Sequence, residues 1–262
     1  MSIYCTSDLH ADFADNWSLL ERLPAVEYER DTLIVAGDIA DRIDRIKRTL
    51  ELLRAKFGQV FYTPGNHELW VRGDERNSLE KLEQLMALCD RLDVRTQPGL
   101  AAGHWIVPLL SWYDESLDGD SDVDPASLEG WGDFHFCRWP ADLGEPSAYF
   151  LNLNEPVLKE YDRPVITFSH FLPRRELLPA LDKLRFKGLP RVAGTADLER
   201  QIRATGSVMH VFGHSHINRD QTIDGIRYVQ HAMLYPRERE WLGSAGIDYW
   251  RSGGPLLELV KE

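Results

Sequence analysis

The chain has 262 residues, of which 43% are hydrophobic and 27% are charged, as expected for a globular protein with one large α/β domain. It carries 30 basic and 42 acidic side chains, and the formal charge of −12 argues against binding long nucleic acids through their phosphates. No apolar run approaches the roughly 20 residues of a membrane-spanning helix, which argues against a membrane protein.

The three cysteines, Cys5, Cys89 and Cys137, are widely spaced and form no Cys-x-x-Cys pair. Such cysteines suit a reducing compartment, and the first residues lack the basic and apolar regions of a signal sequence. We therefore expect a cytoplasmic protein. The sequence leaves the oligomeric state open.

Strands and helices are predicted to alternate through the first hundred residues. Short β-prone runs predict strands at 3–6, 32–36 and 60–62, and apolar residues three and four apart predict helices at 17–23, 42–57 and 78–92. The run 32–36 is apolar throughout and ends at Gly37, which is typical of a strand covered on both faces. This alternation favours a parallel sheet with right-handed crossovers.

The pattern changes after a strand predicted at 104–112. Residues 113–162 hold an acidic loop at 114–124, an aromatic cluster, and a predicted helix at 147–161. We interpret 113–162 as an insertion or flap within a single domain of residues 1–262. The cluster consists of Trp131, Phe134, Phe136 and Trp139; it is interpreted as a local mini-core or, alternatively, as the wall of a substrate pocket.

The last third of the chain returns to strands. Strands are predicted at 164–168, 208–212 and 256–260, a helix at 196–204, and a hairpin of 221–223 with 226–229. The turn of that hairpin is Asp224-Gly225, a strong two-residue hairpin signal. The stretch 174–194 is loop-rich and basic, with Arg174, Arg175, Lys183, Arg185, Lys187 and Arg191.

Five β-prone segments end in polar side chains that can bind metals. They are followed by Asp8-Leu9-His10, Gly37-Asp38-Ile39-Ala40-Asp41, Gly65-Asn66-His67-Glu68, Ser169-His170 and Gly213-His214-Ser215-His216. Because ligands bind at the carboxyl ends of strands in open α/β sheets, we expect these side chains to meet. Nitrogen and oxygen donors suit Mn, Fe, Co, Ni or Zn. Seven donors are too many for one ion, so a pair of cations bridged by one carboxylate is predicted.

Each motif alone has a simpler explanation. Asp8-Leu9-His10 and Gly37-Asp38 are common in surface turns, Gly65-Asn66 is an ordinary turn signal, and His170 could be a hydrogen-bonded loop histidine. His214 and His216 flank Ser215 and therefore face the same way in an extended segment. The joint occurrence of all five motifs favours the metal site.

In this order, the motifs resemble those of the calcineurin-like metallophosphoesterase superfamily and span residues 8 to 216. The resemblance implies an α/β fold in which two mixed β-sheets form a four-layer sandwich flanked by helices, rather than one parallel sheet. It also implies a ligand set: Asp8, His10, Asp38 and His216 for one ion, and Asp38, Asn66, His170 and His214 for the other, with Asp38 as the bridge.

A mechanism follows from this arrangement. Two divalent ions roughly 3.5–4 Å apart can share a water and lower its pKa, so that a bridging hydroxide attacks phosphorus. The leaving alkoxide needs a proton, and His67, beside Asn66 but not assigned to a metal, is the predicted general acid. In similar enzymes this histidine is held by the second Asp of Gly-Asp-x-x-Asp, here Asp41. The alternative for Asp41 is a solvated residue at a helix N-terminus.

Arg42 is a candidate phosphate ligand. Gly37 to Arg42 partly resembles the corresponding motif of phosphoprotein phosphatases, in which the Arg holds phosphate. The sequence departs from that motif because Ile43 stands where Gly would follow. In addition, Ser169-His170-Phe171 lacks the His-Gly pair of that family.

We therefore predict metal-dependent hydrolysis of a mono- or diester in a small phosphorylated substrate, with two ions of Mn, Fe, Zn, Ni or Co. The motifs also resemble those of bacterial cyclic-nucleotide phosphodiesterases. The alternatives are a phosphoprotein phosphatase and a non-catalytic scaffold that keeps the fold, although a scaffold should have lost ligands or the acid histidine. A nuclease could stack bases on the aromatic cluster, but no basic stripe accompanies it.

Overall fold

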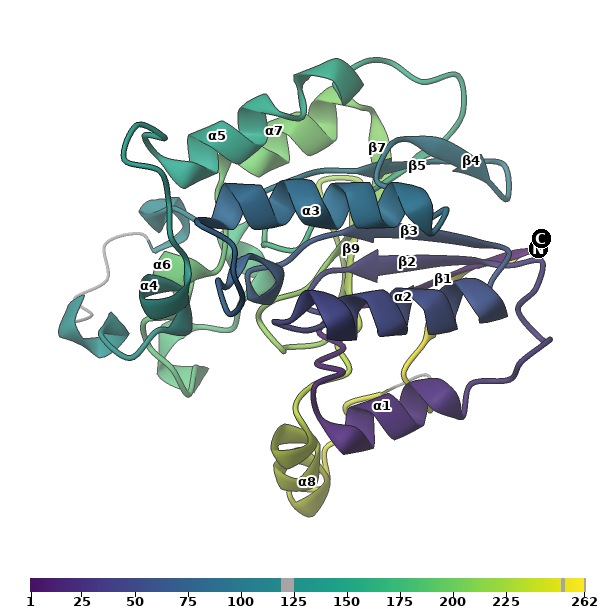
Figure 1. Cartoon of the computed structure of the whole chain (residues 1–262), viewed down its shortest axis with the longest axis horizontal. Helices are drawn as coiled ribbons and strands as arrows, with labels where there is room; N and C mark the ends of the chain where they lie inside the picture. Colours follow the sequence, from purple (N-terminus) through teal and green to yellow (C-terminus); the bar gives the residue numbers. More distant parts are fainter. Residues whose placement is uncertain (119–124, 251–252, 262) are drawn as a thin grey trace.

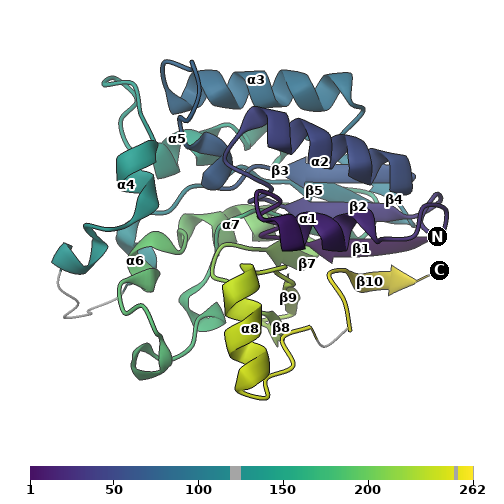
Figure 2. The ribbon, with the colours of Figure 1, turned by 60° about the horizontal axis from the view of Figure 1, so that its bottom comes forward.

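The computed structural model describes residues 1–118, 125–250 and 253–261. Its core consists of two β-sheets packed face to face, with helices on the outer side of each sheet (Figures 1 and 2). This is the two-sheet α/β sandwich implied by the family resemblance, and that prediction is confirmed.

The first sheet has the strand order β10-β1-β2-β3. Its strands are β1 (Ser2–Thr6), β2 (Thr32–Ala36), β3 (Gln59–Thr63) and β10 (Leu257–Lys261). β1, β2 and β3 are parallel, and β10 runs antiparallel to β1. Alternate residues of β2 serve different layers: Leu33 and Val35 contact the helices, whereas Ile34 and Ala36 contact the second sheet.

Three amphipathic helices cover the outer face of this sheet. They are α1 (Ala14–Glu21), α2 (Ile43–Lys56) and α3 (Ser78–Arg91), and Figure 2 shows them together on one side. Asn77 caps α3 by accepting a hydrogen bond from the Glu80 amide at 2.9 Å. The buried stripe of α2, which includes Leu50 and Leu53, packs on the sheet.

The second sheet has the order β4-β5-β6-β7-β9-β8. Its strands are β4 (Gly99–Ala101), β5 (His104–Pro108), β6 (Val165–Phe168), β7 (Ser207–Phe212), β8 (Arg219–Ile223) and β9 (Ile226–Gln230). β5, β6, β7 and β9 are parallel, and the edge strands β4 and β8 are antiparallel. Phe61, Ile166 and Phe168 meet between the two sheets.

The remaining helices are short. They are α4 (Gly132–Phe136), α5 (Pro146–Asn152), α6 (Leu189–Val192), α7 (Asp197–Ala204) and α8 (Pro236–Ser244). The 3₁₀ turns are η1 (His67–Leu69), η2 (Glu115–Leu117), η3 (Pro125–Leu128), η4 (Glu155–Val157), η5 (Arg175–Leu177) and η6 (Leu181–Lys183). Side chains of α5, α6 and α7 pack on the outer face of the second sheet.

Several predictions from the sequence pattern were wrong. A single parallel sheet was favoured, but the strands divide into two mixed sheets. The helix predicted at 147–161 ends at Asn152 because the Asn154 side chain bonds both backbone groups of Leu110 and Pro156 follows. The strand predicted at 104–112 ends at Pro108.

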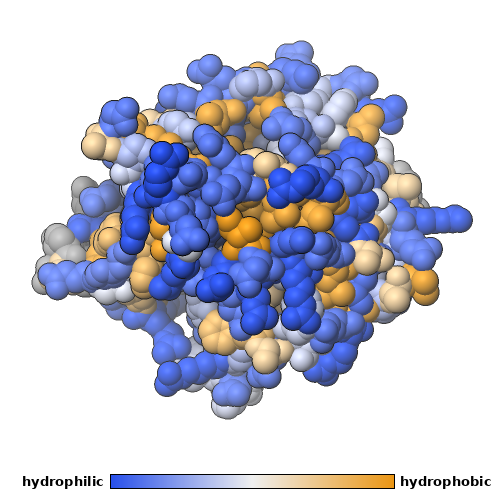
Figure 3. Space-filling view, viewed as in Figure 1, coloured by the Kyte–Doolittle hydropathy of each residue, from blue (hydrophilic) through white to orange (hydrophobic). Residues whose placement is uncertain are grey.

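The face seen in Figure 1 is mostly hydrophilic, and hydrophobic side chains reach it only in separate patches (Figure 3). Within the described ranges, none of the helices has the length and apolar character needed to span a bilayer. Part of the predicted acidic loop, namely Asp120, Asp122 and Asp124, lies outside the described residues.

Candidate metal centre

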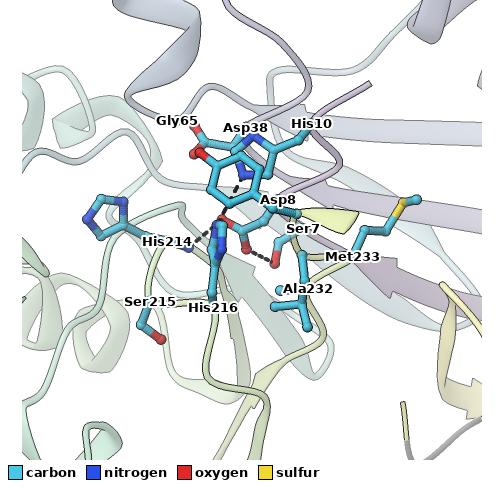
Figure 4. Close-up of polar contacts among 12 residues, drawn as sticks. Ser7, Asp8, His10, Asp38, Gly65, His214, Ser215, His216, Ala232 and Met233 are labelled. Carbon is cyan, nitrogen blue, oxygen red and sulfur yellow. Dashed lines mark hydrogen bonds and ion pairs between the residues drawn. The ribbon is translucent and has the colours of Figure 1, made fainter. Parts of the chain in front are cut away.

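The carboxyl ends of β1, β2, β3, β6 and β7 bring the predicted donors together. Figure 4 shows the side chains of Asp8, His10, Asp38 and His216 gathered where strands end, with His214 beside them. Three groups of donors each have ligand atoms within 4.8 Å of one another: Asp8 with His10 and His216, Asp38 with His170 and His214, and Asp38 with His10 and His67. Asp38 is common to two groups, as a bridging ligand would be.

The first cluster combines one carboxylate with two imidazoles. Nε2 of His10 lies 3.0 Å from Nε2 of His216, and Nε2 of His216 lies 3.4 Å from Oδ1 of Asp8. Asp8 and His10 are almost completely buried. Two imidazole nitrogens and one carboxylate oxygen therefore face the same small volume.

The second cluster adds the amide oxygen of Asn66. This oxygen lies 3.1 Å from Nε2 of His170 and 3.0 Å from Nδ1 of His214. The two imidazole nitrogens are 3.2 Å apart, and Oδ1 of Asp38 lies 3.4 Å from Nε2 of His170. All four side chains are buried.

The outward-facing nitrogens of three histidines are held by acceptors. Nδ1 of His170 bonds the Ala36 carbonyl at 2.9 Å, and Nε2 of His214 bonds the Val192 carbonyl at 2.8 Å. Nδ1 of His216 bonds Glu238 at 2.7 Å. Such bonds orient a metal-binding histidine and direct its other nitrogen at the ion. The donor set therefore fits a pair of divalent cations.

The charges of the cluster are coupled. Burial opposes ionisation of both acids, but His216 lowers the pKa of Asp8 to about 2, and His170 lowers the pKa of Asp38 well below its usual value. Burial also opposes protonation of His170, but the Asp38 carboxylate raises its pKa to about 9. The site keeps both carboxylates ionised and favours positive charge between them.

Backbone strain is concentrated at the same residues. Asp8, His10, Asp38, His214 and His216 all have positive φ angles, between 42° and 70°. For residues other than glycine, this region costs roughly 1–2 kcal/mol per residue. Strain of this kind persists only where the surrounding structure enforces it, and it is typical of functional sites.

Two glycines are required by the packing of these loops. A Cβ on Gly65 would meet Oδ1 of Asp38 and the His170 ring, and a Cβ on Gly37 would meet Nδ1 of His170. The buried carboxylate of Glu68 joins the two loops by accepting from the amides of Asp38 at 3.0 Å and Gly65 at 2.7 Å. Burial and the nearby Asp38 raise the pKa of Glu68 to about 7.

His67 lies beside the clusters with its ring partly exposed. Its Nε2 is 3.9 Å from Oδ2 of Asp38 and 3.3 Å from the hydroxyl of Tyr235. The Trp70 ring packs against it at a centroid distance of 3.7 Å. The Tyr235 ring also stacks on His10, with centroids 4.1 Å apart and an angle of 27°. Tyr235 therefore contacts both His10, a predicted metal ligand, and His67, the predicted general acid.

The ion pairs of Asp41 and Arg42 involve residues outside the predicted donor set. The Asp41 carboxylate accepts from Arg72 at 3.0 Å. The Arg42 side chain is 60% exposed and pairs with Asp44 at 3.1 Å. This geometry gives no support to the roles predicted for the two residues, which stay predictions.

Asp133, from the 113–162 segment, contacts the centre from outside. This nearly buried carboxylate accepts from Nδ2 of Asn66 at 2.8 Å and from Nε1 of Trp70 at 2.6 Å through one oxygen. Its other oxygen accepts from Nε1 of Trp131 at 2.8 Å. The bond to Nδ2 turns the Asn66 amide so that its oxygen faces His170 and His214.

Sequence reasoning did not find Tyr235, Glu238 or Asp133. A helix start at Tyr235 was readable, because Pro236 opens the helix and Glu238 occupies the third helical position. No motif or spacing in the sequence around these residues indicated that they contact the metal centre. Of the predicted aromatic cluster, Trp131 lines a cleft, whereas Trp139 packs in a separate mini-core with Trp112 and Phe150.

The clusters lie at the bottom of a cleft of about 1670 Å³. Its lining also includes residues 130–133, 183–186 and 189, together with residues of α8 and 247–249. Asp38, Asn66, His67, His214 and His216 line its floor. A substrate in the cleft would therefore reach both the clusters and His67.

The fold and the site define a class of hydrolase that acts on phosphoesters. The family model described as calcineurin-like phosphoesterase matches residues 1–218, so the chain belongs to this family.

The chain also resembles a curated protein, the [acyl-carrier-protein] phosphodiesterase PptH of Mycobacterium tuberculosis. The two sequences are 28% identical over 260 residues, which covers 90% of this chain and 79% of PptH. The crystal structure of the phosphopantetheinyl hydrolase PptH from M. tuberculosis has a TM-score of 0.78 at 25% identity, covering 100% of this chain and 96% of that chain. The similarity thus extends over the whole fold and supports phosphoester hydrolysis.

Proposed function

We propose that this protein hydrolyses a phosphodiester with two divalent metal ions. Asp8, His10, Asp38 and His216 would hold one ion, and Asp38, Asn66, His170 and His214 the other, with Asp38 shared. The observation that carries the proposal is the convergence of these donors from five strand ends, five of them in left-handed backbone conformations. Nitrogen and oxygen donors suit Mn, Fe, Zn, Ni or Co.

When bound, the ions would supply a water of lowered pKa and neutralise the charge of the phosphate. His67 would donate a proton from its ring to the oxygen of the leaving alcohol. The Tyr235 hydroxyl, 3.3 Å from Nε2, and the Trp70 ring would hold the imidazole in place. In this proposal Tyr235 has the role of holding His67, which the family resemblance implied for Asp41.

The proposed substrate is a phosphopantetheinylated carrier protein. The name of the similar protein PptH supports this choice, and so does the volume of the cleft. Pockets for single small molecules have volumes of about 300–1,000 Å³, whereas this cleft measures about 1670 Å³. Hydrolysis would break the bond between phosphorus and the alcohol oxygen of the carrier protein. The water oxygen would become part of the released phosphopantetheine, and the carrier alcohol would regain its proton.

The other candidate functions have less support. A scaffold would not need the strained donor loops, and the exposed position of Arg42 does not favour a protein-phosphatase-like phosphate contact.

We further propose one domain of residues 1–262 in which the 113–162 insertion supplies Trp131 and Asp133 to the cleft. The free cysteines suit a cytoplasmic location.

The experiment is to incubate the Mn²⁺-supplied protein with a phosphopantetheinylated acyl carrier protein and to follow the carrier mass. We expect loss of the phosphopantetheinyl group, and faster hydrolysis of bis(p-nitrophenyl) phosphate than of p-nitrophenyl phosphate. Asp38→Ala should remove both activities. Preference for the monoester would reject the diesterase assignment, and full activity in excess chelator would reject the metal scheme.

A further inference from the structure

The basic stretch noted in the sequence lies at the mouth of the cleft. Lys183 and Arg185 line the cleft, and Lys187 follows two residues later; all three side chains are exposed. In the described part of the chain no ion pair ties these three cations to an acid, and Lys187 bonds only the carbonyls of Leu181 and Asp182. Their charges are therefore not offset by an ion pair within the described chain.

Two arginines of the same stretch are paired with acids. Arg174 pairs with Glu176 at 2.8 Å, and Arg191 pairs with Asp118 at 2.8 Å. The chain thus contrasts paired arginines, which stabilise its own loops, with the unpaired cations of 183–187. Across the residues that the structure describes, the cations of 183–187 thus have no acidic partner, although Lys187 bonds backbone carbonyls and Arg185 lies over the Trp241 ring.

Residues of α8 and of the segment after it continue the same surface. Arg237, at the start of α8, is exposed and lines the cleft. Trp241 and Ile247 are each 48% exposed, and the Arg185 guanidinium lies 4.6 Å from the Trp241 ring centroid, which brings the two segments together. Tryptophan and arginine are the residue types that dominate binding energy at protein interfaces.

The charge of this mouth is opposite to that of the molecule. Its exposed cations are Lys183, Arg185, Lys187 and Arg237, and its exposed acids are Asp182, Glu240 and Asp248; Arg239 and Glu238 are half-buried, and Glu238 bonds His216. Cations are therefore in excess here, although acids outnumber bases by 42 to 30 in the whole chain. A complementary partner would be anionic.

We propose that this mouth, formed by residues 183–187 and the 237–248 region, is the docking surface for an acidic face of the carrier protein. The inference rests on the proposed function and adds where the protein part of the substrate binds. The cations would contact acidic side chains, Trp241 and Ile247 would cover apolar surface, and the phosphopantetheinyl phosphodiester would reach the clusters at the cleft floor. Nucleic acid fits less well because the cations are few and form no continuous stripe.

The test compares two substrates in charge-reversed variants. Arg185→Glu and Arg237→Glu are measured with a phosphopantetheinylated acyl carrier protein and with bis(p-nitrophenyl) phosphate. Charges at the rim of an interface act mainly on the rate at which the two proteins associate. We therefore expect kcat/KM for the carrier protein to fall roughly tenfold more than kcat/KM for the small diester. Added salt should reduce the wild-type rate on the carrier protein more than the variant rate. Arg163→Glu, an exposed cation just before β6, is the matched control.

Direct binding separates this inference from the proposed function. Calorimetry of the carrier protein with wild type, Arg185→Glu and Arg163→Glu tests docking even where no hydrolysis is seen. Weaker binding in Arg185→Glu alone supports the docking surface, whatever the activity. Equal losses on both substrates, equal binding by all three proteins, or tighter binding of a single-stranded oligonucleotide than of the carrier protein would overturn it.

Discussion

The hydroxyl of Tyr235 lies 3.3 Å from Nε2 of His67, and both residues line the cleft. Leu234, just before Tyr235, has a φ of 68°, which is costly for a bulky residue and indicates that this tyrosine is held in place. The hydroxyl is therefore built into the environment of the predicted acid.

Tyr235→Phe should weaken catalysis without disturbing metal binding, because the ring that stacks on His10 is retained. A hydrogen bond contributes about 0.5–1.5 kcal/mol, so kcat should fall about two- to tenfold. Metal content, measured by elemental analysis, should stay at the wild-type value. Tyr235→Ala removes the stacking as well and should lower both quantities. An unchanged kcat in Tyr235→Phe would show that the hydroxyl does not act on His67.

His67→Ala tests the general acid through the leaving group. An alkyl alcohol needs a proton as it departs, whereas p-nitrophenolate leaves readily without one. We expect a loss of about 10²–10⁴-fold on the carrier-protein ester and a clearly smaller loss on bis(p-nitrophenyl) phosphate. His104→Ala, at the amino end of β5, controls for general effects of removing a histidine. Equal losses on the two esters would contradict the assignment.

Asp133→Asn tests whether the insertion positions Asn66. The carboxylate accepts from Asn66, Trp70 and Trp131, and an amide in its place must present NH₂ to at least one of these donors. Loss of such an outer contact typically costs roughly 10–100-fold in metal affinity. We expect a loss of this size for one of the two ions, measured by competition with a chelator.

Asp114→Asn is the matched control for this variant. Asp114 also belongs to the insertion and accepts from Ser116, Ser147 and Thr195, but among the described residues it forms no hydrogen bond with Asn66. If both variants lose metal affinity equally, the effect comes from loosening of the insertion and not from the contact with Asn66.

The sequence alone was sufficient to predict those elements whose pattern lies within one short segment. The apolar run of β2 and the helical spacing of α2 and α3 place these elements to within a few residues. The donors could be predicted to meet because each follows a strand, and the carboxyl ends of parallel strands lie at the same edge of a sheet. The roles of these residues as ligands stay predictions until metal is measured.

The rest depends on contacts between distant residues. Burial on both faces of β2 was readable, but not that one face meets a second sheet. His67 and Tyr235 are 168 positions apart, and Asn66 and Asp133 are 67 apart. Neither pair has a spacing or a motif that links its members, so only the folded chain reveals them.

Metal should also stabilise the fold, because it would bind the native donors and not the dispersed ones of the unfolded chain. Asp8 and Asp38 are 0% and 2% exposed, and a cation would offset the cost of keeping both ionised. Ligand at a hundred times its Kd adds about 2.7 kcal/mol, which corresponds to a rise in Tm of about 5–10 °C for a chain of this size. Calorimetry with Mn²⁺ and with chelator measures the difference. The rise in Tm should persist in Arg42→Ala, whose exposed guanidinium pairs with Asp44 and not with a predicted donor, and shrink in Asp38→Ala. A Tm that is the same with Mn²⁺ and with chelator would mean that the seven donors do not form a metal site.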